Sequence, residues 1–228
     1  MYVSDWTQDC QRMGAAGDHQ RVKRMMIERF VRALYAPYAD GYIEMRCLWP
    51  REAPAEHGPY QTTKVYHFKL DASGPDVKQI CCAAHREEAL GMDVYLGVLP
   101  RKRRREAAKK GDVLAAGALW LDLDFKICPQ EAALVHLQTM QADIIVHSGN
   151  GYHGYWYAQP VVDLQGAKAN LTMFEGKLKV FQSTGPWAAG ARPDATHNVD
   201  RILRLPGTTN WKRWDAPLPV RLIKAPKV

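Results

Sequence analysis

The chain has 228 residues, of which 46% are hydrophobic and 24% charged, a composition typical of a folded globular protein rather than a disordered one. Lysine and arginine number 31 against 24 aspartate and glutamate, and the net charge of +7 favours a polyanionic partner, with nucleic acid first. No stretch reaches the apolar length of a membrane span, and the N-terminus lacks a signal-peptide pattern. We therefore expect an intracellular, cytoplasmic protein with no membrane partner.

The cysteines do not predict a metal site. There are five of them, an odd number, with Cys81 and Cys82 adjacent and without a Cys-x-x-Cys spacing, which suits reduced thiols. Cys81, Cys82 and His85 could belong to a zinc site, but no second pair of ligands is apparent. We interpret them as structural residues and expect no zinc.

The order of the predicted elements indicates a mixed α/β fold. Residues 1–20 are polar and mixed, so we expect a flexible leader or a short helix, followed by one domain over residues 21–228. Apolar residues at helical spacing predict an amphipathic helix that packs on a sheet. The predicted elements are a helix over 21–35, strands over 41–46, 64–70 and 93–98, a helix over 129–140, strands over 143–147 and 154–157, a helix over 164–181 and a strand over 220–223.

Two aspartates, Asp122 and Asp124, interrupt an apolar run over residues 118–125 that reads as a buried strand. Side chains alternate along a strand, so the two carboxylates point to one face while the leucines beside them pack on the other. Buried carboxylates need a compensating cation, and Mg²⁺ prefers one or two carboxylates together with substrate phosphates and water. The alternative is structural, because an Asp at a strand end can cap the following turn.

A run of five basic residues comes just before the acidic strand. Its members are Arg101, Lys102, Arg103, Arg104 and Arg105. We expect the run to connect two strands of the same sheet, over residues 93–98 and 118–125, where it could contact phosphates near the acidic strand. The alternative is a solvated, mobile loop without a binding role, which is the usual state of such a charge run.

A glycine-rich turn, Ser148-Gly149-Asn150-Gly151-Tyr152-His153, joins two further strands. Its two glycines let the backbone approach a ligand closely and expose successive N–H groups, as in anion-binding nests. The Ser148 hydroxyl and the His153 imidazole can both donate a hydrogen bond to a phosphate. The alternative is a hairpin whose histidine has only a structural role.

A third cluster of charged residues lies near the C-terminus. Asp194 or Asp200 could complete a three-carboxylate site for two metal ions, the arrangement used in phosphoryl transfer. Arg201, Arg204 and Lys212 are further cations for a polyphosphate or a nucleic-acid backbone. Alternatively, one of the arginines pairs with a carboxylate of the core.

Taken together, these segments resemble the three motifs of archaeo-eukaryotic primases. They are the Leu-Asp122-Leu-Asp124 strand, the Ser148-Gly-Asn-Gly-Tyr-His153 hairpin and the run Arg201-Ile-Leu-Arg204-Leu-Pro-Gly-Thr-Thr-Asn-Trp-Lys212. Order and approximate spacing match over residues 21–212, and the likeness is to the RepB-like primase and primase-polymerase branch of plasmids, phages and other mobile elements. The hairpin and the arginine-containing run are the more specific parts.

The resemblance implies a two-lobed α/β (α+β) catalytic core with an RRM-like sheet, flanking helices and a cleft between the lobes. It also implies DNA-templated nucleotidyl transfer, in which a primase or primase-polymerase makes or extends primers on single-stranded DNA. The implied cofactors are two Mg²⁺ or Mn²⁺ ions, and the implied substrates are NTPs or dNTPs. No helicase motor of the Gly-Lys-Thr type follows, so we expect a replicative helicase in trans or in a removed C-terminal region.

Site residues are carried over by their positions in the motifs. Asp122, Asp124 and Asp194 would be the catalytic metal ligands, with Asp200 as the alternative third carboxylate. The implied nucleotide-binding residues are Ser148, Gly149, Asn150, Gly151, His153, Arg204 and Lys212. Nucleic-acid contacts are expected from the basic run.

Three other functions compete with this interpretation. A catalytically inactive, primase-like module that binds single-stranded nucleic acid fits the basic charge equally well, but acidic groups in a binding cleft would repel phosphates without a metal. An Asp-nucleophile phosphatase of the haloacid dehalogenase type expects Thr or Val two residues after its second Asp, whereas Lys126 occupies that position here. A rolling-circle nickase needs paired histidines, and His147 and His153 are too far apart in sequence.

Overall fold

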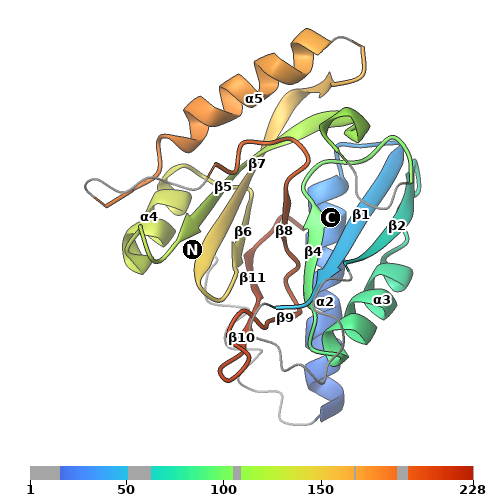
Figure 1. Cartoon of the computed structure of the whole chain (residues 1–228), viewed down its shortest axis with the longest axis vertical. Helices are drawn as coiled ribbons and strands as arrows, with labels where there is room; N and C mark the ends of the chain where they lie inside the picture. Colours follow the sequence, from blue (N-terminus) through green and yellow to red (C-terminus); the bar gives the residue numbers. More distant parts are fainter. Residues whose placement is uncertain (1–15, 51–62, 105–108, 167, 189–194, 228) are drawn as a thin grey trace.

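Two antiparallel β-sheets lie side by side and form the frame of the molecule (Figure 1). The computed structural model describes residues 16–50, 63–104, 109–166, 168–188 and 195–227. In spatial order, the five-stranded sheet consists of β3 (Gly74–Pro75), β2 (Lys64–Asp71), β1 (Gly41–Leu48), β4 (Asp93–Gly97) and β8 (Ile202–Arg204). The four-stranded sheet consists of β11 (Arg221–Lys224), β6 (Ile144–His147), β7 (Gly151–Asp163) and β5 (Ala115–Asp124). A short hairpin, β9 (Thr209–Asn210) and β10 (Leu218–Pro219), completes the described strands.

The helices flank these sheets (Figure 1). They are α2 (Ala16–Tyr35), α3 (Val77–Ala89), α4 (Gln130–Thr139) and α5 (Lys168–Gln182). The predicted mixed α/β fold with flanking helices is therefore confirmed. None of the described helices is long and apolar enough to cross a membrane.

Helix α2 joins the two sheets through one large core. Its side chains at helical spacing, including Ile27, Phe30 and Leu34, are buried together with residues of both sheets. Phe30, for example, lies edge-on to Tyr155 of β7, with ring centroids 5.6 Å apart. The apolar stripe of the sequence thus has its expected role, because burial of such side chains is the main favourable term in folding.

Within the four-stranded sheet, β5, α4, β6 and β7 form a split βαβ unit. Leu121 and Leu123 of β5 pack into a second core with Ala133 and Leu137 of α4. Trp120, on the opposite face of β5, belongs to the large core shared with α2 and the five-stranded sheet. One face of β5 is therefore covered by α4, and the other faces the rest of the molecule.

Two expectations about the fold were incomplete or wrong. The strands before and after the basic run lie in different sheets, since β4 pairs with β1 and β8 whereas β5 pairs with β7. Helix α3 was not predicted, although Asp76 caps it by accepting a hydrogen bond from the Gln79 N–H at 3.0 Å. That Asp-x-x-Gln spacing is a helix-start signal in the sequence. In α3, Cys81 is buried and Cys82 is exposed.

Candidate functional site

The aspartates of β5 lie on the face that α4 does not cover. Asp122 and Asp124 alternate with the buried leucines of the second core, and the Asp122 side chain is 30% exposed. Asp124 Oδ1 accepts a hydrogen bond from the Lys126 N–H at 2.9 Å and so caps the turn that follows the strand. A carboxylate has two oxygens and about four lone pairs, so this turn leaves acceptor capacity for a cation.

His153 of β7 is the direct cross-strand neighbour of Asp122. The two side chains meet with His153 Nε2 3.6 Å from Asp122 Oδ1, too long for a hydrogen bond. Complete burial, followed by the charges of Arg204 and Arg201, lowers the pKa of His153 to about 3. The imidazole is therefore neutral near pH 7, and its buried Nδ1 has no hydrogen-bond partner among the described residues. A neutral ring next to a carboxylate can still donate one hydrogen bond to a bound anion.

Arg204 brings a cation to this site from the edge of the five-stranded sheet. Its Nη1 forms an ion pair with Asp93 Oδ1 at 2.5 Å, and its guanidinium lies 4.8 Å from the ring centroid of Tyr95 on the neighbouring strand. Arg204 and Arg201 both depress the pKa of His153, which places them within electrostatic reach of the four-stranded sheet. The alternative that an arginine pairs with a core carboxylate therefore holds for Arg204, although its charge still acts at the site.

The glycine-rich turn is joined directly to the C-terminal motif. Asn210 Nδ2 donates a hydrogen bond to the Ser148 carbonyl oxygen at 2.7 Å, and Ser148 Oγ donates to the Gly151 carbonyl at 3.1 Å. Gly149 has a φ of +96°, and a methyl group there would lie 3.0 Å from Asn210 Nδ2. Both glycine conformation and close packing therefore contribute to this turn. The Lys212 N–H donates to Asn210 Oδ1 at 3.0 Å, and the lysine side chain is exposed.

A cavity of about 210 Å³ opens beside Asp122. It lies between β5, the end of α5 and residues 195–197, and Lys179, Trp187 and His197 are among its lining residues. Sequence reasoning did not single out these three residues. They stand outside the motifs, and only the fold brings α5 and the segments that follow it to Asp122.

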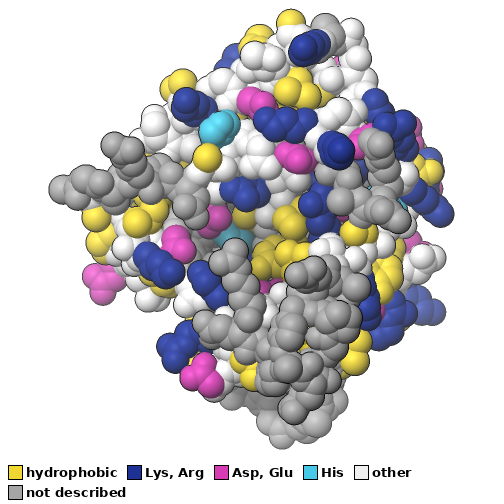
Figure 2. Space-filling model, in the orientation of Figure 1, with side chains coloured by type: hydrophobic (Ala, Val, Ile, Leu, Met, Phe, Trp, Pro, Cys, Tyr) yellow, Lys and Arg dark blue, Asp and Glu magenta, His cyan; other side chains and the backbone are white. Residues whose placement is uncertain are grey.

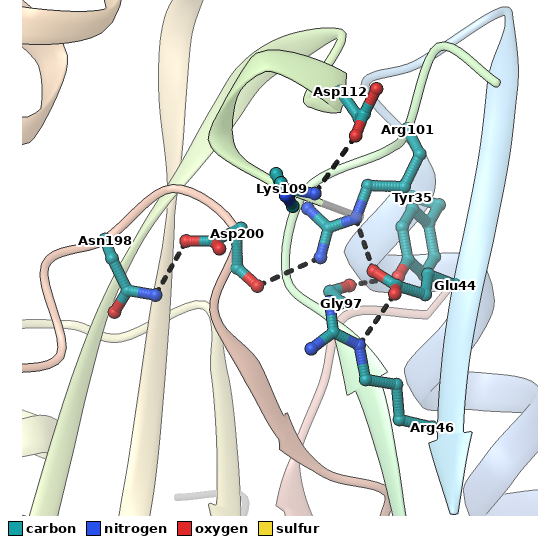
Figure 3. A network of polar contacts seen from close by, with 9 residues as sticks. All are labelled: Tyr35, Glu44, Arg46, Gly97, Arg101, Lys109, Asp112, Asn198 and Asp200. Carbon is teal, nitrogen blue, oxygen red and sulfur yellow. Dashed lines mark hydrogen bonds and ion pairs between the residues drawn. The ribbon is translucent and has the colours of Figure 1, made fainter. Parts of the chain in front are cut away.

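The two candidates for a third carboxylate differ in what surrounds them. Asp194 lies outside the described residues, but the next residue, Ala195, lines the cavity beside Asp122. The Asp200 carboxylate accepts a hydrogen bond from Asn198 Nδ2 at 2.7 Å, and its carbonyl oxygen accepts one from Arg101 Nη2 at 3.1 Å (Figure 3).

The basic run does not behave as one surface. Arg101 is completely buried, with its Nε 2.6 Å from Glu44 Oε2 of β1, so the prediction that it contacts nucleic acid is wrong for this residue (Figure 3). Its guanidinium compensates a buried carboxylate, which a solvated lysine or arginine would not do. Lys102, Arg103 and Arg104 are exposed, and Arg105 lies outside the described residues.

The charged side chains that are exposed include many cations. On the face seen in Figure 2, Lys and Arg side chains lie over both halves of the molecule, with acidic side chains and histidine between them. Among the described residues, no group of three His, Cys, Asp or Glu side chains converges as a complete metal site. The described carboxylates thus supply at most two ligands, the number that Mg²⁺ commonly takes from protein when phosphates and water complete its shell.

The fold defined by these sheets and helices is that of the catalytic domain of archaeo-eukaryotic primases. The chain is similar to the primase RepB′, with a TM-score of 0.53 and 13% identity, over 89% of this chain and 56% of that one. It therefore spans little more than half of that RepB′ chain. The catalytic domain of RepB′ in complex with initiator DNA matches with a TM-score of 0.52 and 16% identity, over 89% of this chain and 85% of that one.

A third similar structure is the archaeo-eukaryotic primase domain of the cyanophage S-2L primase-polymerase. It matches with a TM-score of 0.50 and 11% identity, over 89% of this chain and 88% of that one. No protein-family model and no curated protein matches the sequence. At these identities the likeness concerns the fold, and the roles of individual residues rest on the geometry described above.

Proposed function

We propose that the protein is a DNA-templated nucleotidyltransferase, a primase or primase-polymerase that makes or extends primers on single-stranded DNA in the replication of a plasmid, phage or other mobile element. The observation that carries the proposal is the meeting of the two sheets, where Asp122 lies beside His153 and within reach of the Arg204 charge. A carboxylate and a guanidinium close together can bind a polyphosphate with its metal ion. The similarity of the fold to primases suggests that the reaction is nucleotidyl transfer.

Asp122 and Asp124 are proposed to hold Mg²⁺ or Mn²⁺. The fit is chemical: Asp122 is partly exposed beside a cavity, and Asp124 retains acceptor capacity beyond its turn hydrogen bond. Asp194 is the proposed third ligand, since its neighbour Ala195 lines that cavity whereas the Asp200 carboxylate is bonded to Asn198. When bound, two such ions would activate the attacking hydroxyl and stabilise the pyrophosphate leaving group.

The neutral His153 is proposed to donate a hydrogen bond to the triphosphate of the incoming nucleotide. Arg204 is preorganised for the same anion, because Asp93 and Tyr95 hold its guanidinium in place before any ligand arrives. Ser148, Gly149, Asn150 and Gly151 form the turn, and Lys212 is linked to it through Asn210. These residues align and neutralise the triphosphate, which is most of what nucleotidyl transfer asks of a protein.

The test is synthesis on a single-stranded DNA template with labelled nucleotides and Mg²⁺ or Mn²⁺, with and without a primer. The variant Asp122→Asn/Asp124→Asn removes both charges but keeps an oxygen that can accept the Lys126 N–H. Asp40→Ala, at a surface position whose side chain is 74% exposed, is the matched control.

We expect product from the wild type and from Asp40→Ala, and none from the double variant with its melting temperature unchanged. Product without a primer identifies a primase, and product only with a primer identifies a polymerase. Substantial synthesis by the double variant would contradict the metal-ligand assignment. Absence of product from the wild type under every condition, with DNA binding intact, would favour an inactive binding module.

A further inference from the structure

We propose that the loop Trp211-Lys212-Arg213-Trp214, called here the tryptophan loop, is a stacking platform for single-stranded DNA. The inference deepens the proposed function, because it assigns a place to the template. The loop follows β9 and precedes β10, and it combines two indole rings with two exposed cations. Proteins that bind single strands without sequence preference use aromatic rings for the bases and cations for the backbone.

The two indoles form one aromatic unit. Trp211 and Trp214 lie with ring centroids 5.2 Å apart and a 36° angle between their planes, and both are partly exposed. Trp214 fits over Gly91, where an added methyl group would come within 2.3 Å of the indole. Because Gly91 has no side chain, the Trp214 indole can pack directly against it, and Trp211 packs against Trp214. A supported, partly exposed ring loses little conformational freedom when a base stacks on it.

The cations of the tryptophan loop point to a polyanion. Lys212 and Arg213 are exposed, and Arg213 meets only Asp215 among the described residues, at 3.4 Å and with both side chains more than 60% exposed. Such a surface ion pair is weak and is readily exchanged for a phosphate contact. The partner that satisfies stacking rings and backbone-binding cations together is a single-stranded nucleic acid.

The loop is coupled to the proposed nucleotide site through its backbone. The Trp211 N–H donates to Asp93 Oδ1 at 2.7 Å, and the same carboxylate holds Arg204. The Lys212 N–H donates to Asn210, which binds the turn at Ser148. A strand that stacks on the tryptophan loop is therefore held next to the residues proposed to bind the triphosphate, as templated synthesis requires.

The experiment measures binding of a fluorescent oligothymidine of about 20 nucleotides by anisotropy, without nucleotide or metal ion. Trp211→Leu should weaken binding by about tenfold or more, whereas Trp211→Phe, which keeps a ring, should stay within about threefold of the wild type. Arg213→Ala should lower the slope of affinity against salt by about 0.7. Arg32→Ala, which removes an exposed arginine from a pair with Glu28 in the last turn of α2, should change neither quantity.

Affinity of Trp211→Leu within about twofold of the wild type, with an unchanged melting temperature, would overturn the proposal. Equal losses in the Phe and Leu variants would also overturn it, since stacking tolerates any ring. If Trp211→Leu does not fold, the comparison of Arg213→Ala with Arg32→Ala serves as the test. Equal changes in the salt dependence of oligothymidine binding in these two variants would contradict a role of the tryptophan loop. Displacement of the DNA by a free nucleoside triphosphate would assign the platform to the nucleotide base instead, and so contradict a template site.

The same assay separates this inference from the proposed function. Trp211→Leu is assayed for template-directed synthesis as well as for oligothymidine binding, so that each proposal can fail while the other stands. DNA binding that depends on Trp211 in a protein without synthesis would leave the platform standing and remove the enzymatic proposal. If Trp211→Leu keeps both synthesis and the DNA affinity of the wild type, the enzymatic proposal would stand and the stacking platform would be ruled out.

Discussion

Replacing Arg101 by Met should strongly destabilise the protein, because it leaves a buried carboxylate without its main partner. Both Arg101 and Glu44 are completely buried, with Arg101 Nε 2.6 Å from Glu44 Oε2. A methyl group at Gly97 would lie 2.7 Å from Arg101 Nη2, so this glycine leaves the room that the guanidinium occupies. Removing one partner of a buried pair costs about 3–5 kcal/mol. That is a large share of the roughly 5–15 kcal/mol that stabilises a typical domain.

Denaturant unfolding followed by circular dichroism measures this cost, with Arg46→Met as the matched control. Arg46 Nε pairs with the other oxygen of the same carboxylate at 2.7 Å but is 18% exposed. Its loss should cost about 1 kcal/mol. Only Arg101 also donates to the Asp200 carbonyl, so its variant should additionally loosen the loop that leads into β8 (Figure 3).

The double variant Glu44→Gln/Arg101→Met completes the cycle. It should be more stable than Arg101→Met alone, because a neutral amide is less costly to bury than a carboxylate that has lost one of its two arginine partners. The reasoning fails if Arg101→Met unfolds within about 1 kcal/mol of the wild type, or no more easily than Arg46→Met.

Two further predictions concern His153 and the glycines. The pKa of His153 is lowered to about 3 in the folded protein, so near pH 6 the histidine is protonated only in the unfolded chain. The free energy of unfolding therefore falls as the pH falls. Between about pH 7.5 and about pH 5, the free energy of unfolding of His153→Gln should therefore fall by about 2 kcal/mol less than that of the wild type. Denaturant unfolding at the two pH values measures this difference, and an equal fall in both proteins would contradict the burial of a neutral ring. Gly151→Ala would place a methyl group 2.4 Å from the Leu123 carbonyl oxygen, so it should lower the melting temperature. Gly176→Ala, in α5 with open space around it, should instead stabilise by about 0.5–1 kcal/mol, and the same sign for both substitutions would refute this account.

Local patterns in the sequence predicted much of the fold. The alternation in residues 118–125 placed Asp122 and Asp124 on one face, because a strand has a side-chain period of two wherever it lies. The glycine-rich turn between two apolar runs predicted the hairpin of β6 and β7 for the same local reason. The Asp76-x-x-Gln79 start of helix α3 is a local signal of the same kind, so this helix is encoded in the sequence as well.

Other features depend on residues that are far apart in the chain. The sequence around Arg204 does not indicate that Asp93 is its ion-pair partner. The two residues meet because β8 pairs with β4. The cavity residue Lys179 likewise reaches Asp122 through the packing of α5 on β5, and His197 reaches it from the segment before β8. Strand pairing and helix packing select such neighbours from many equally plausible ones.

By itself, then, the sequence determined most of the longer elements, the placement of Asp122 and Asp124 on one face of β5 and the basic character of the chain. All of these follow from local periodicity and composition. Tertiary structure alone decided which charges are buried. Arg101 begins a run of five cations that reads as a solvated loop, yet it lies in the core because Glu44, 57 residues away, needs its charge there. Burial of a charge depends on whether a partner compensates the loss of water, and that partner is chosen by the fold.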